Sequence, residues 1–169
     1  DIRTVSIEHK LGIHGSPTAV LSYGDNGGAT GFLLGEEHHG LEYMFVMMNK
    51  ARHAVGIEAY AIAERSYQSA LAYAKQRIQG WGIVDPKDQR IPIIQHPDVA
   101  RMLLEMRCRI EAMRALSLYV AAEQDRANNN TEQAAQIYHQ QVANVLIPIV
   151  KGWGSEIGTW GFGWGLESG

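Results

Sequence analysis

The stretch RHAVGIEAYAIAERSYQSALAYAKQRIQG, residues 52–80, decides the fold class of this chain. With the residues before it, it predicts one unbroken helix of about 40 residues, because apolar residues recur at the three- and four-residue spacing of a buried helix face. A helix of this length exceeds most globular helices and indicates a helical bundle. The predicted buried positions are Leu41, Met44, Phe45, Met48, Ala51 or Arg52, Val55, Ala59, Ile62, Tyr67, Leu71, Ala74 and Ile78.

Two residues near the start of this stretch require an explanation. Gly56 costs about 1 kcal/mol relative to alanine inside a helix, and such a cost usually reflects the close approach of another backbone or of a ligand. Arg52 lies one turn earlier, near the buried stripe, where an unpaired guanidinium would be strongly unfavourable. We therefore expect Arg52 to form a structural ion pair, with Glu105 or Glu111, or to contact a ligand phosphate.

The residues before this helix have the pattern of strands. The segments RTVSIEH, PTAVLSYG and ATGFLLG predict three short strands, separated by the glycine-rich turns LGIHGS and GDNGG. Three short strands cannot bury both faces of a sheet. We therefore expect residues 1–36 to be the end of a larger β domain, and residues 37–169 to be a helical-bundle domain.

The loop WGIVDPKDQRIPIIQHPD leads to a second predicted helix. Pro97 and Asp98 suit its first turn, since proline there lacks only an unpaired N–H and aspartate complements the helix dipole. Its apolar residues fall almost on a heptad. These residues are Val99, Leu103, Met106, Ile110, Met113, Ser117 and Val120.

A polar turn, RANNN, precedes Thr131, which is the expected N-cap of a third helix. That helix runs past Val142, Val145, Leu146 and Ile149. Pro148 predicts a kink or a restart, and the glycines and tryptophans of GWGSEIGTWGFGWGLESG break the helical period. Three long helices leave a bundle that is short of at least one helix.

Composition excludes several classes of protein. The net charge of -3, with 20% charged residues, gives no electrostatic reason to expect nucleic acid or an anionic membrane as a partner. No apolar run is long enough to span a bilayer, and DIRTVSIEHK lacks the features of a signal peptide. We expect a cytoplasmic protein. Cys108, the single cysteine, lies in a helical pattern and is expected to be a buried, reduced thiol.

Several candidate sites have a simpler interpretation. Residues 36–40, EEHHG, have the residue types of a metal site, but adjacent histidines in one turn do not converge on an ion, and a solvated loop is the better interpretation. Glycines 152, 154 and 158 follow no strand and lack the spacing of a dinucleotide-binding loop. Glutamates separate the arginines of the second helix, which favours an ion-paired face over a basic stripe. These arginines are Arg101, Arg107, Arg109 and Arg114.

The order of motifs resembles the acyl-CoA dehydrogenases. The run EHKLGIHGSPTAVLSYG is similar to the strand pair that closes their middle β domain, and GEEHHGL is similar to the turn that opens their C-terminal helical domain. The segments HPDVARMLLEMRCRIEAMRALSLY and PIVKGW also fit, particularly the branch that resembles the methylthiopropanoyl-CoA dehydrogenases. The resemblance covers residues 8 to about 153. It implies a fragment of a flavoprotein oxidoreductase of fatty acid metabolism, whose C-terminal four-helix bundle and middle domain hold FAD between them.

The resemblance also implies roles for individual residues. Arg52 matches the arginine at the substrate end of the site, where acyl-CoA binds. Arg77 and Gln79 match the segment that reaches the FAD diphosphate of a neighbouring subunit, for which the planar fork of arginine is suited. The implied assembly is a homo-oligomer, a dimer or a homotetramer, and the implied electron acceptor is electron-transfer flavoprotein. No metal, nucleic acid or membrane partner is implied.

The sequence departs from the family at three positions. Gly80 stands where phenylalanine commonly follows the arginine and glutamine, and TWGFGWG lacks the glutamine of the motif that it resembles. The catalytic glutamate of the family lies either after that glycine motif or directly before the arginine that matches Arg52. The latter position is Ala51, which cannot accept a proton, and the former would lie beyond Gly169. We therefore expect no catalytic base among these residues and an inactive fragment.

Two functions follow from this resemblance. One is an FAD-dependent acyl-CoA dehydrogenase that introduces an α,β double bond into an acyl-CoA thioester. The alternative is a dehydrogenase-like flavin-binding protein that no longer oxidises acyl-CoA, similar to the alkylation-response members that bind DNA. The net charge and the absence of a lysine or arginine run argue against the alternative.

Overall fold

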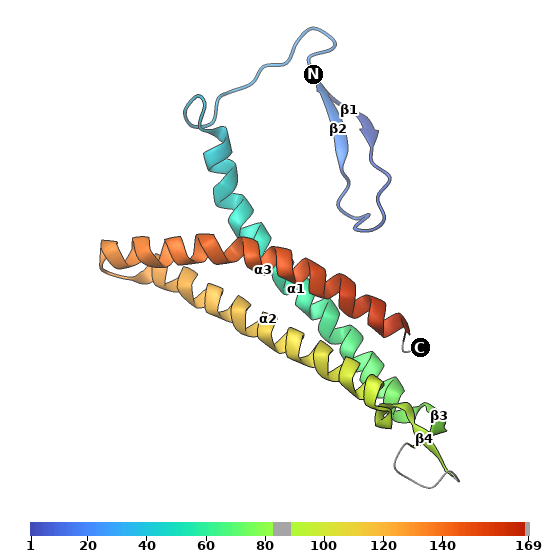
Figure 1. Cartoon of the computed structure of the whole chain (residues 1–169). Coiled ribbons are helices and arrows are strands. Elements are labelled where there is room, and N and C mark those ends of the chain that lie inside the picture. Colours follow the sequence, from blue (N-terminus) through green and yellow to red (C-terminus); the bar gives the residue numbers. More distant parts are fainter. Residues whose placement is uncertain (83–88, 168–169) are drawn as a thin grey trace. The chain divides into compact units, whose positions relative to one another are not determined.

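The computed structural model describes residues 1–82 and 89–167, and of residues 161–167 it describes the backbone alone. The chain divides into two units, Asp1–Tyr43 and Met44–Gly169. In chain order the elements are β1 (Ile2–Ile7), β2 (Ala19–Tyr23), α1 (Gly40–Gln76), β3 (Ile78–Trp81), β4 (Arg90–Pro92), the 3-10 turn η1 (Ile93–Gln95), α2 (Pro97–Asn129) and α3 (Gln133–Glu167) (Figure 1). The three long helices of the described residues confirm the predicted, mainly helical fold.

In the first unit, β1 and β2 form an antiparallel hairpin that pairs Ile2 with Tyr23 at one end and Ile7 with Ala19 at the other. Nearly every residue of both strands is exposed, because a two-stranded sheet alone cannot bury a face. The third predicted strand, residues 29–35, is wrong. This segment has irregular backbone. A strand needs a neighbouring strand to bond its backbone N–H and C=O groups, and within the described residues β1 and β2 pair only with each other.

Helix α1 has 37 residues, close to the predicted length, and it buries the predicted Ala59 and Ala74, but the rest of its buried face differs from the prediction. The predicted core positions Leu41, Met44, Phe45, Val55 and Ile62 are exposed. The buried residues are His53, Gly56, Ala59, Ala63, Ala70 and Ala74. Small residues lie here because α3 crosses closely. A Cβ on Gly56 would lie 3.1 Å from the carbonyl oxygen of Val150, and a Cβ on Gly154 would lie 3.3 Å from the Gly56 backbone. The expected backbone approach at Gly56 is confirmed.

The end of α1 also differs from the prediction. The helix stops at Gln76, and residues 78–81, predicted to be helix and loop, form strand β3, which pairs with β4. Gly80 has a φ of +75°, a conformation that excludes a continuing right-handed helix. The N–H of Ile93 donates to the carbonyl of Arg77 and extends this pairing by one bond, of 2.8 Å.

Helix α2 follows the prediction closely. It begins at Pro97, and its buried residues are Leu103, Met106, Ile110, Met113, Ser117, Val120 and Glu123. The predicted burial of Cys108 is wrong, because this thiol lies on the exposed side of the helix. The predicted N-cap Thr131 is also wrong. The side-chain oxygen of Asn130 accepts the backbone N–H of Glu132 at 3.0 Å, and α3 begins one residue later, at Gln133.

Helix α3 continues through every residue that was expected to interrupt it. It passes Pro148 without a restart, and the glycine-rich segment after residue 152 remains helical to Glu167. Figure 1 shows the axis of α3 changing direction between its orange and red halves, as a proline inside a helix predicts. A Cβ on Gly158 would lie 3.3 Å from the Ala59 carbonyl of α1, so small residues of α3 permit the crossing. Gly154 and Gly158 are therefore packing residues.

The helical core lies where the three helices meet. Its buried cluster consists of Ala63, Ile110, Met113, Val120, Ala143, Ile147, Val150 and Ile157. One carboxylate is buried near the turn that joins α2 to α3. Glu123 has a side chain that is only 3% exposed, and it accepts from Arg126 at 2.5 Å and from Nδ1 of His139 at 2.6 Å. The hydrogen bond from His139, followed by that from Arg126, lowers the pKa of Glu123 against the effect of burial.

Candidate functional site

The middle of α1 places Arg52 beside the helical core without a carboxylate partner. Its guanidinium lies 5.6 Å from the ring centroid of Phe45. No aspartate or glutamate of the described residues lies within ion-pair distance of it. The predicted alternative of an ion pair with Glu105 or Glu111 is wrong, because these carboxylates pair with arginines of α2 itself. The positive charge of Arg52 is therefore available to a ligand.

His53 fixes this turn of α1 to α2. The imidazole is buried, and its Nε2 lies 3.2 Å from the Ser117 carbonyl and 3.1 Å from the Ser117 hydroxyl. Nδ1 lies 3.0 Å from the side-chain oxygen of Gln124. His53 was not among the residues predicted from the sequence. The sequence pattern that could have indicated His53 is a polar residue on the same helix face as Gly56 and Ala59.

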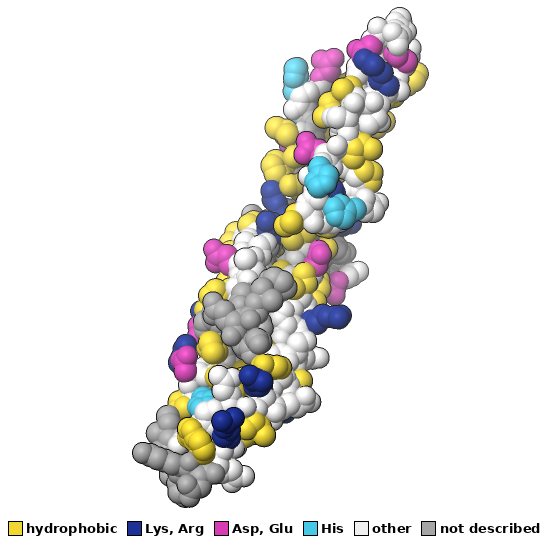
Figure 2. All heavy atoms as spheres, turned by 90° about the vertical axis from the view of Figure 1, so that its right-hand side faces the viewer, with side chains coloured by type: hydrophobic (Ala, Val, Ile, Leu, Met, Phe, Trp, Pro, Cys, Tyr) yellow, Lys and Arg dark blue, Asp and Glu magenta, His cyan; other side chains and the backbone are white. Residues whose placement is uncertain are grey.

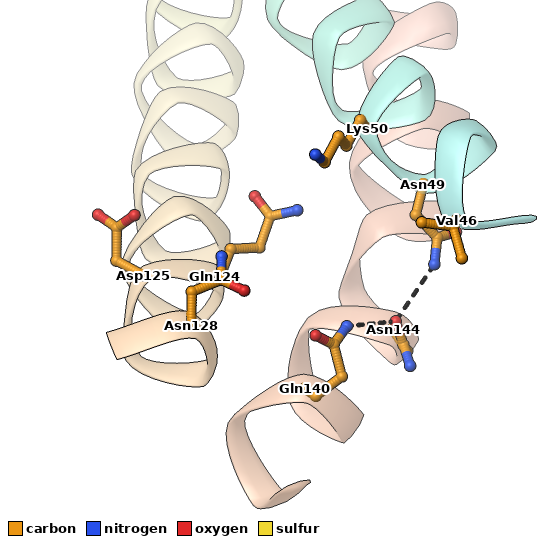
Figure 3. A pocket seen from close by; sticks show the side chains of 8 residues that line it. All are labelled: Val46, Asn49, Lys50, Gln124, Asp125, Asn128, Gln140 and Asn144. Atoms are coloured by element: carbon orange, nitrogen blue, oxygen red, sulfur yellow. Dashed lines mark hydrogen bonds between the residues drawn. The ribbon is translucent and has the colours of Figure 1, made fainter. Parts of the chain in front are cut away.

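A polar groove lies between the three helices (Figure 3). Its volume is about 480 Å³. It is lined by Val46, Asn49 and Lys50 of α1, Gln124, Asp125 and Asn128 of α2, and Gln140 and Asn144 of α3. Asn144 accepts from Asn49 at 3.2 Å and from Gln140 at 2.9 Å. Figure 3 shows Lys50 and Gln124 extending toward one another, whereas Asp125 points away. The groove offers many donors and acceptors to a polar ligand.

The other candidate residues, Arg77 and Gln79, lie beyond the far end of α1. Both side chains are exposed, and within the described residues neither makes a side-chain hydrogen bond or an ion pair. Their backbone carbonyls are both occupied, by the N–H of Ile93 at 2.8 Å and by Nε2 of His96 at 2.7 Å. The backbone is therefore held while the polar side chains stay available to a ligand.

The two candidate regions of one chain are far apart. At a rise of 1.5 Å per residue, the helix between Arg52 and Arg77 spans roughly 37 Å. One small ligand cannot contact both residues in the same chain. The structure therefore separates the two candidate regions, one within α1 and one just beyond its end.

The arginines of α2 do not form a basic surface. Their partners are Asp98 and Glu105 for Arg101, Glu111 for Arg107, Glu105 for Arg109, and Glu64 and Glu111 for Arg114. On the face drawn in Figure 2, basic side chains lie among acidic and apolar ones. The hydrogen bond from Gln68, followed by that from Arg114, lowers the pKa of Glu64 on α1. The predicted ion-paired face is confirmed.

The EEHHG segment is a loop before α1, as predicted. His39 lies 3.0 Å from a carboxylate oxygen of Glu42 and 4.0 Å from one of Glu36. Among the described residues, no group of three or more metal-ligating side chains converges. The helices of the described residues include none that is long and apolar enough to cross a membrane.

Comparisons with known proteins agree on one family. Residues 38–146 match the family model described as acyl-CoA dehydrogenase, C-terminal domain. The chain is 51% identical over 152 residues to 3-methylmercaptopropionyl-CoA dehydrogenase of Ruegeria pomeroyi, covering 90% of this chain and 25% of that protein. It is 38% identical over 162 residues to the broad-specificity linear acyl-CoA dehydrogenase FadE5 of Mycobacterium tuberculosis, covering 89% of this chain and 26% of that protein.

A solved structure is similar in fold to this chain. Butyryl-CoA dehydrogenase from Megasphaera elsdenii matches 95% of this chain and 39% of its own, with a TM-score of 0.57 and 26% sequence identity. The chain thus spans about a quarter of the length of the curated relatives described above.

Proposed function

Because this chain belongs to the acyl-CoA dehydrogenase family, we propose that it is the carboxyl-terminal part of a longer FAD-dependent enzyme, called here the parent enzyme. The parent enzyme introduces an α,β double bond into an acyl-CoA thioester. The observation that carries this proposal is the family match over residues 38–146. The 51% identity to 3-methylmercaptopropionyl-CoA dehydrogenase supports it and favours a substrate in that class. In this proposal residues 1–36 end the middle β domain and residues 37–169 belong to the helical domain.

The residues near the end of α1 suit the cofactor. FAD carries a diphosphate, and the exposed guanidinium of Arg77, which has no carboxylate partner among the described residues, can donate two hydrogen bonds to phosphate oxygens. Gln79 adds an amide donor beside it. We propose that these two residues hold the FAD diphosphate of a neighbouring subunit. The chemistry that FAD supplies when bound is acceptance, at its flavin N5, of the hydride that leaves the β-carbon of the thioester.

Arg52 is the proposed substrate-binding residue. It has no carboxylate partner within the described residues, and the contacts of His53 with α2 hold the turn on which it lies. Removal of the α-proton requires a carboxylate beside the α-carbon. The position directly before Arg52 is Ala51, so we propose that a residue outside this chain is the base. The chain alone is then inactive.

The proposed assembly is a homo-oligomer, a dimer or a homotetramer. Large apolar side chains of the helices, such as Val55, Ile62, Leu118, Val145 and Ile149, are between 39% and 66% exposed. In a chain that spans a quarter of its relatives, such surface is expected to be covered by other parts or other copies. Electron-transfer flavoprotein is the proposed electron acceptor, on the family resemblance alone. The cytoplasmic location stays a prediction.

The proposal is tested by the visible spectrum of the parent enzyme, recorded anaerobically before and after acyl-CoA thioesters are added. A panel should include 3-methylmercaptopropionyl-CoA and linear acyl-CoAs of different lengths. We expect a bound flavin whose absorbance band bleaches with at least one thioester, because oxidation of the thioester reduces the flavin. A bound flavin that no thioester bleaches would contradict the dehydrogenase and leave a flavin-binding protein. A colourless protein would contradict the cofactor.

A further inference from the structure

The strand pair β3–β4 follows Arg77 directly and includes Gln79, and the side chain of His96 connects it to the start of α2. His96 occupies the N-cap position of α2, where its backbone N–H donates to Ile93 at 3.0 Å and its carbonyl accepts from Ala100 at 3.0 Å. Its backbone is therefore fixed to both η1 and α2. Its ring Nε2 lies 2.7 Å from the carbonyl oxygen of Gln79. Because that carbonyl only accepts, the ring carries its proton on Nε2 and donates it.

The absence of a side chain at Gly80 leaves room for the imidazole of His96. Gly80 has a φ of +75°, and a Cβ there would lie 3.1 Å from Cε1 and 3.2 Å from Nε2 of His96. A side chain at this position would crowd the imidazole sterically, and it would strain the backbone because residues with a side chain rarely adopt a positive φ. The glycine that replaces the phenylalanine of the family pattern is thus the residue against which His96 packs.

Without the imidazole, the Gln79–Gly80 peptide would lose its contact with α2. Glycine has the widest backbone freedom of any residue, so this peptide could rotate. Arg77 directly follows α1, where its N–H donates to the Tyr73 carbonyl, and Gln79 lies two residues later in β3. Rotation of the peptide after Gln79 would change the position of Gln79 relative to Arg77, and a binding site whose groups must first be ordered binds more weakly than a preorganised one.

We propose that His96 is a positioning residue for cofactor binding, which holds the Gln79 carbonyl so that Arg77 and Gln79 face the FAD diphosphate together. This inference rests on the proposed function of those two residues. His96 itself does not touch the cofactor. It acts through the backbone of the strand pair.

The test is the dissociation constant of FAD, measured by flavin fluorescence as the apoenzyme form of the parent enzyme is titrated. In His96→Leu, which removes the donor but keeps an apolar side chain, we expect the constant to rise about 3- to 10-fold, the range of one neutral hydrogen bond. In His96→Gln, whose amide N–H can replace Nε2–H, we expect a return to within about 2-fold of the wild type. The matched control is Gln95→Leu, at the exposed neighbouring position, which should not change the constant.

Two further variants keep the outcomes distinct. Gly80→Ala should weaken FAD binding with the same sign as His96→Leu, because the new methyl group displaces the ring; it also provides a test should His96→Leu fail to fold. Arg77→Ala should weaken FAD binding whatever residue occupies position 96.

If Arg77→Ala weakens binding while His96→Leu and Gly80→Ala bind as the wild type, the positioning role of His96 is wrong and the proposed function stands. If His96→Gln binds as weakly as His96→Leu, the hydrogen bond is not the cause. If Arg77→Ala binds as the wild type, the proposed cofactor role itself is wrong.

Discussion

At the scale of the residue, Gly56 shows how one missing side chain fixes the position of a helix. Its Cα lies against Val150 and Gly154 of α3, so no side chain fits between the two backbones. The close crossing explains why α1 buries alanines and directs its larger apolar side chains outward. Glycine lowers helix propensity here, but it permits a backbone contact that no other residue would allow.

Gly56→Ala should destabilise the parent enzyme by up to about 2 kcal/mol, because overpacking costs about 1–3 kcal/mol and replacing a helical glycine recovers only roughly 1 kcal/mol. The added methyl group would overlap the Val150 side chain and lie 3.1 Å from the Val150 carbonyl oxygen, which cannot change rotamer. The measurement is the midpoint of thermal unfolding. Gly152→Ala is the matched control, because a Cβ there meets no atom within 4 Å. Gly152→Ala should raise the unfolding midpoint, because it replaces a helical glycine without a new contact. Equal shifts in Gly56→Ala and Gly152→Ala would contradict the close approach of α1 and α3 at Gly56.

Arg77→Ala should weaken FAD retention in the parent enzyme while the helices stay folded. A charge-assisted hydrogen bond contributes about 1.5–3 kcal/mol, so we expect the dissociation constant of FAD to rise by roughly 10- to 100-fold. The measurement is the flavin content after dialysis, with circular dichroism as the check on folding. Arg65→Ala, at an exposed position of α1, is the control. Unchanged flavin content in Arg77→Ala would show that Arg77 does not bind the diphosphate.

At the scale of the element, buried charge joins the end of α2 to the start of α3. Glu123 on α2 contacts His139 on α3 at 2.6 Å, across a connection in which Asn130 also supports the first turn of α3. The carboxylate is almost fully enclosed, so the pair depends on the ionised form of Glu123. The junction of the two helices is therefore sensitive to protonation.

This sensitivity predicts a loss of stability in acid. The pKa of Glu123 is lower in the folded protein than the ordinary value of 4.5. A lowered carboxylate pKa stabilises the fold at pH values above the ordinary value, and this contribution is lost as the pH falls through the folded pKa. Glu123→Gln should therefore lower the unfolding midpoint at about pH 7 and show a smaller further decrease at about pH 4 than the wild type does. Glu132→Gln, at an exposed position, is the control. An equal acid decrease in wild type and Glu123→Gln would contradict the role of this carboxylate.

At the scale of the whole molecule, the described helices form a core but leave much apolar surface uncovered. Leu104, Leu118, Ile137, Tyr138 and Val145 are each more than half exposed. The arginines of α2 add no compensating basic surface, because acidic partners neutralise them. The surface is thus suited to contacts with other protein parts, and it lacks the charge that a polyanion would need.

The parent enzyme should therefore not bind duplex DNA through this region. We expect no change in the fluorescence anisotropy of a labelled duplex at about 150 mM salt when the purified chain or the parent enzyme is added, since few unpaired phosphate-binding residues are present to release counterions. A protein of the same size with a basic patch serves as a positive control. Salt-dependent binding would favour the DNA-binding alternative.

The sequence alone determined the helical class, the length of α1, the buried face of α2 and the pairing of its arginines. These features depend on periodicity and on short-range spacing, which the sequence contains directly. The family resemblance also followed from an ordered series of motifs, and the comparisons confirm it. Arg52 was singled out by its place near the buried stripe, and Arg77 and Gln79 through this resemblance; the roles of all three stay predictions.

Packing between elements sets which face of α1 is buried, how α3 continues past Pro148 and its glycines, and how β3 ends the first helix. Each depends on residues far apart in the sequence. Gly56 faces Val150, and the ring of His96 faces Gly80. Helix propensity treats a glycine or a proline as an interruption, but a backbone contact with another element can compensate for its cost. Periodicity describes one helix at a time, so it cannot reveal the neighbour against which that helix packs.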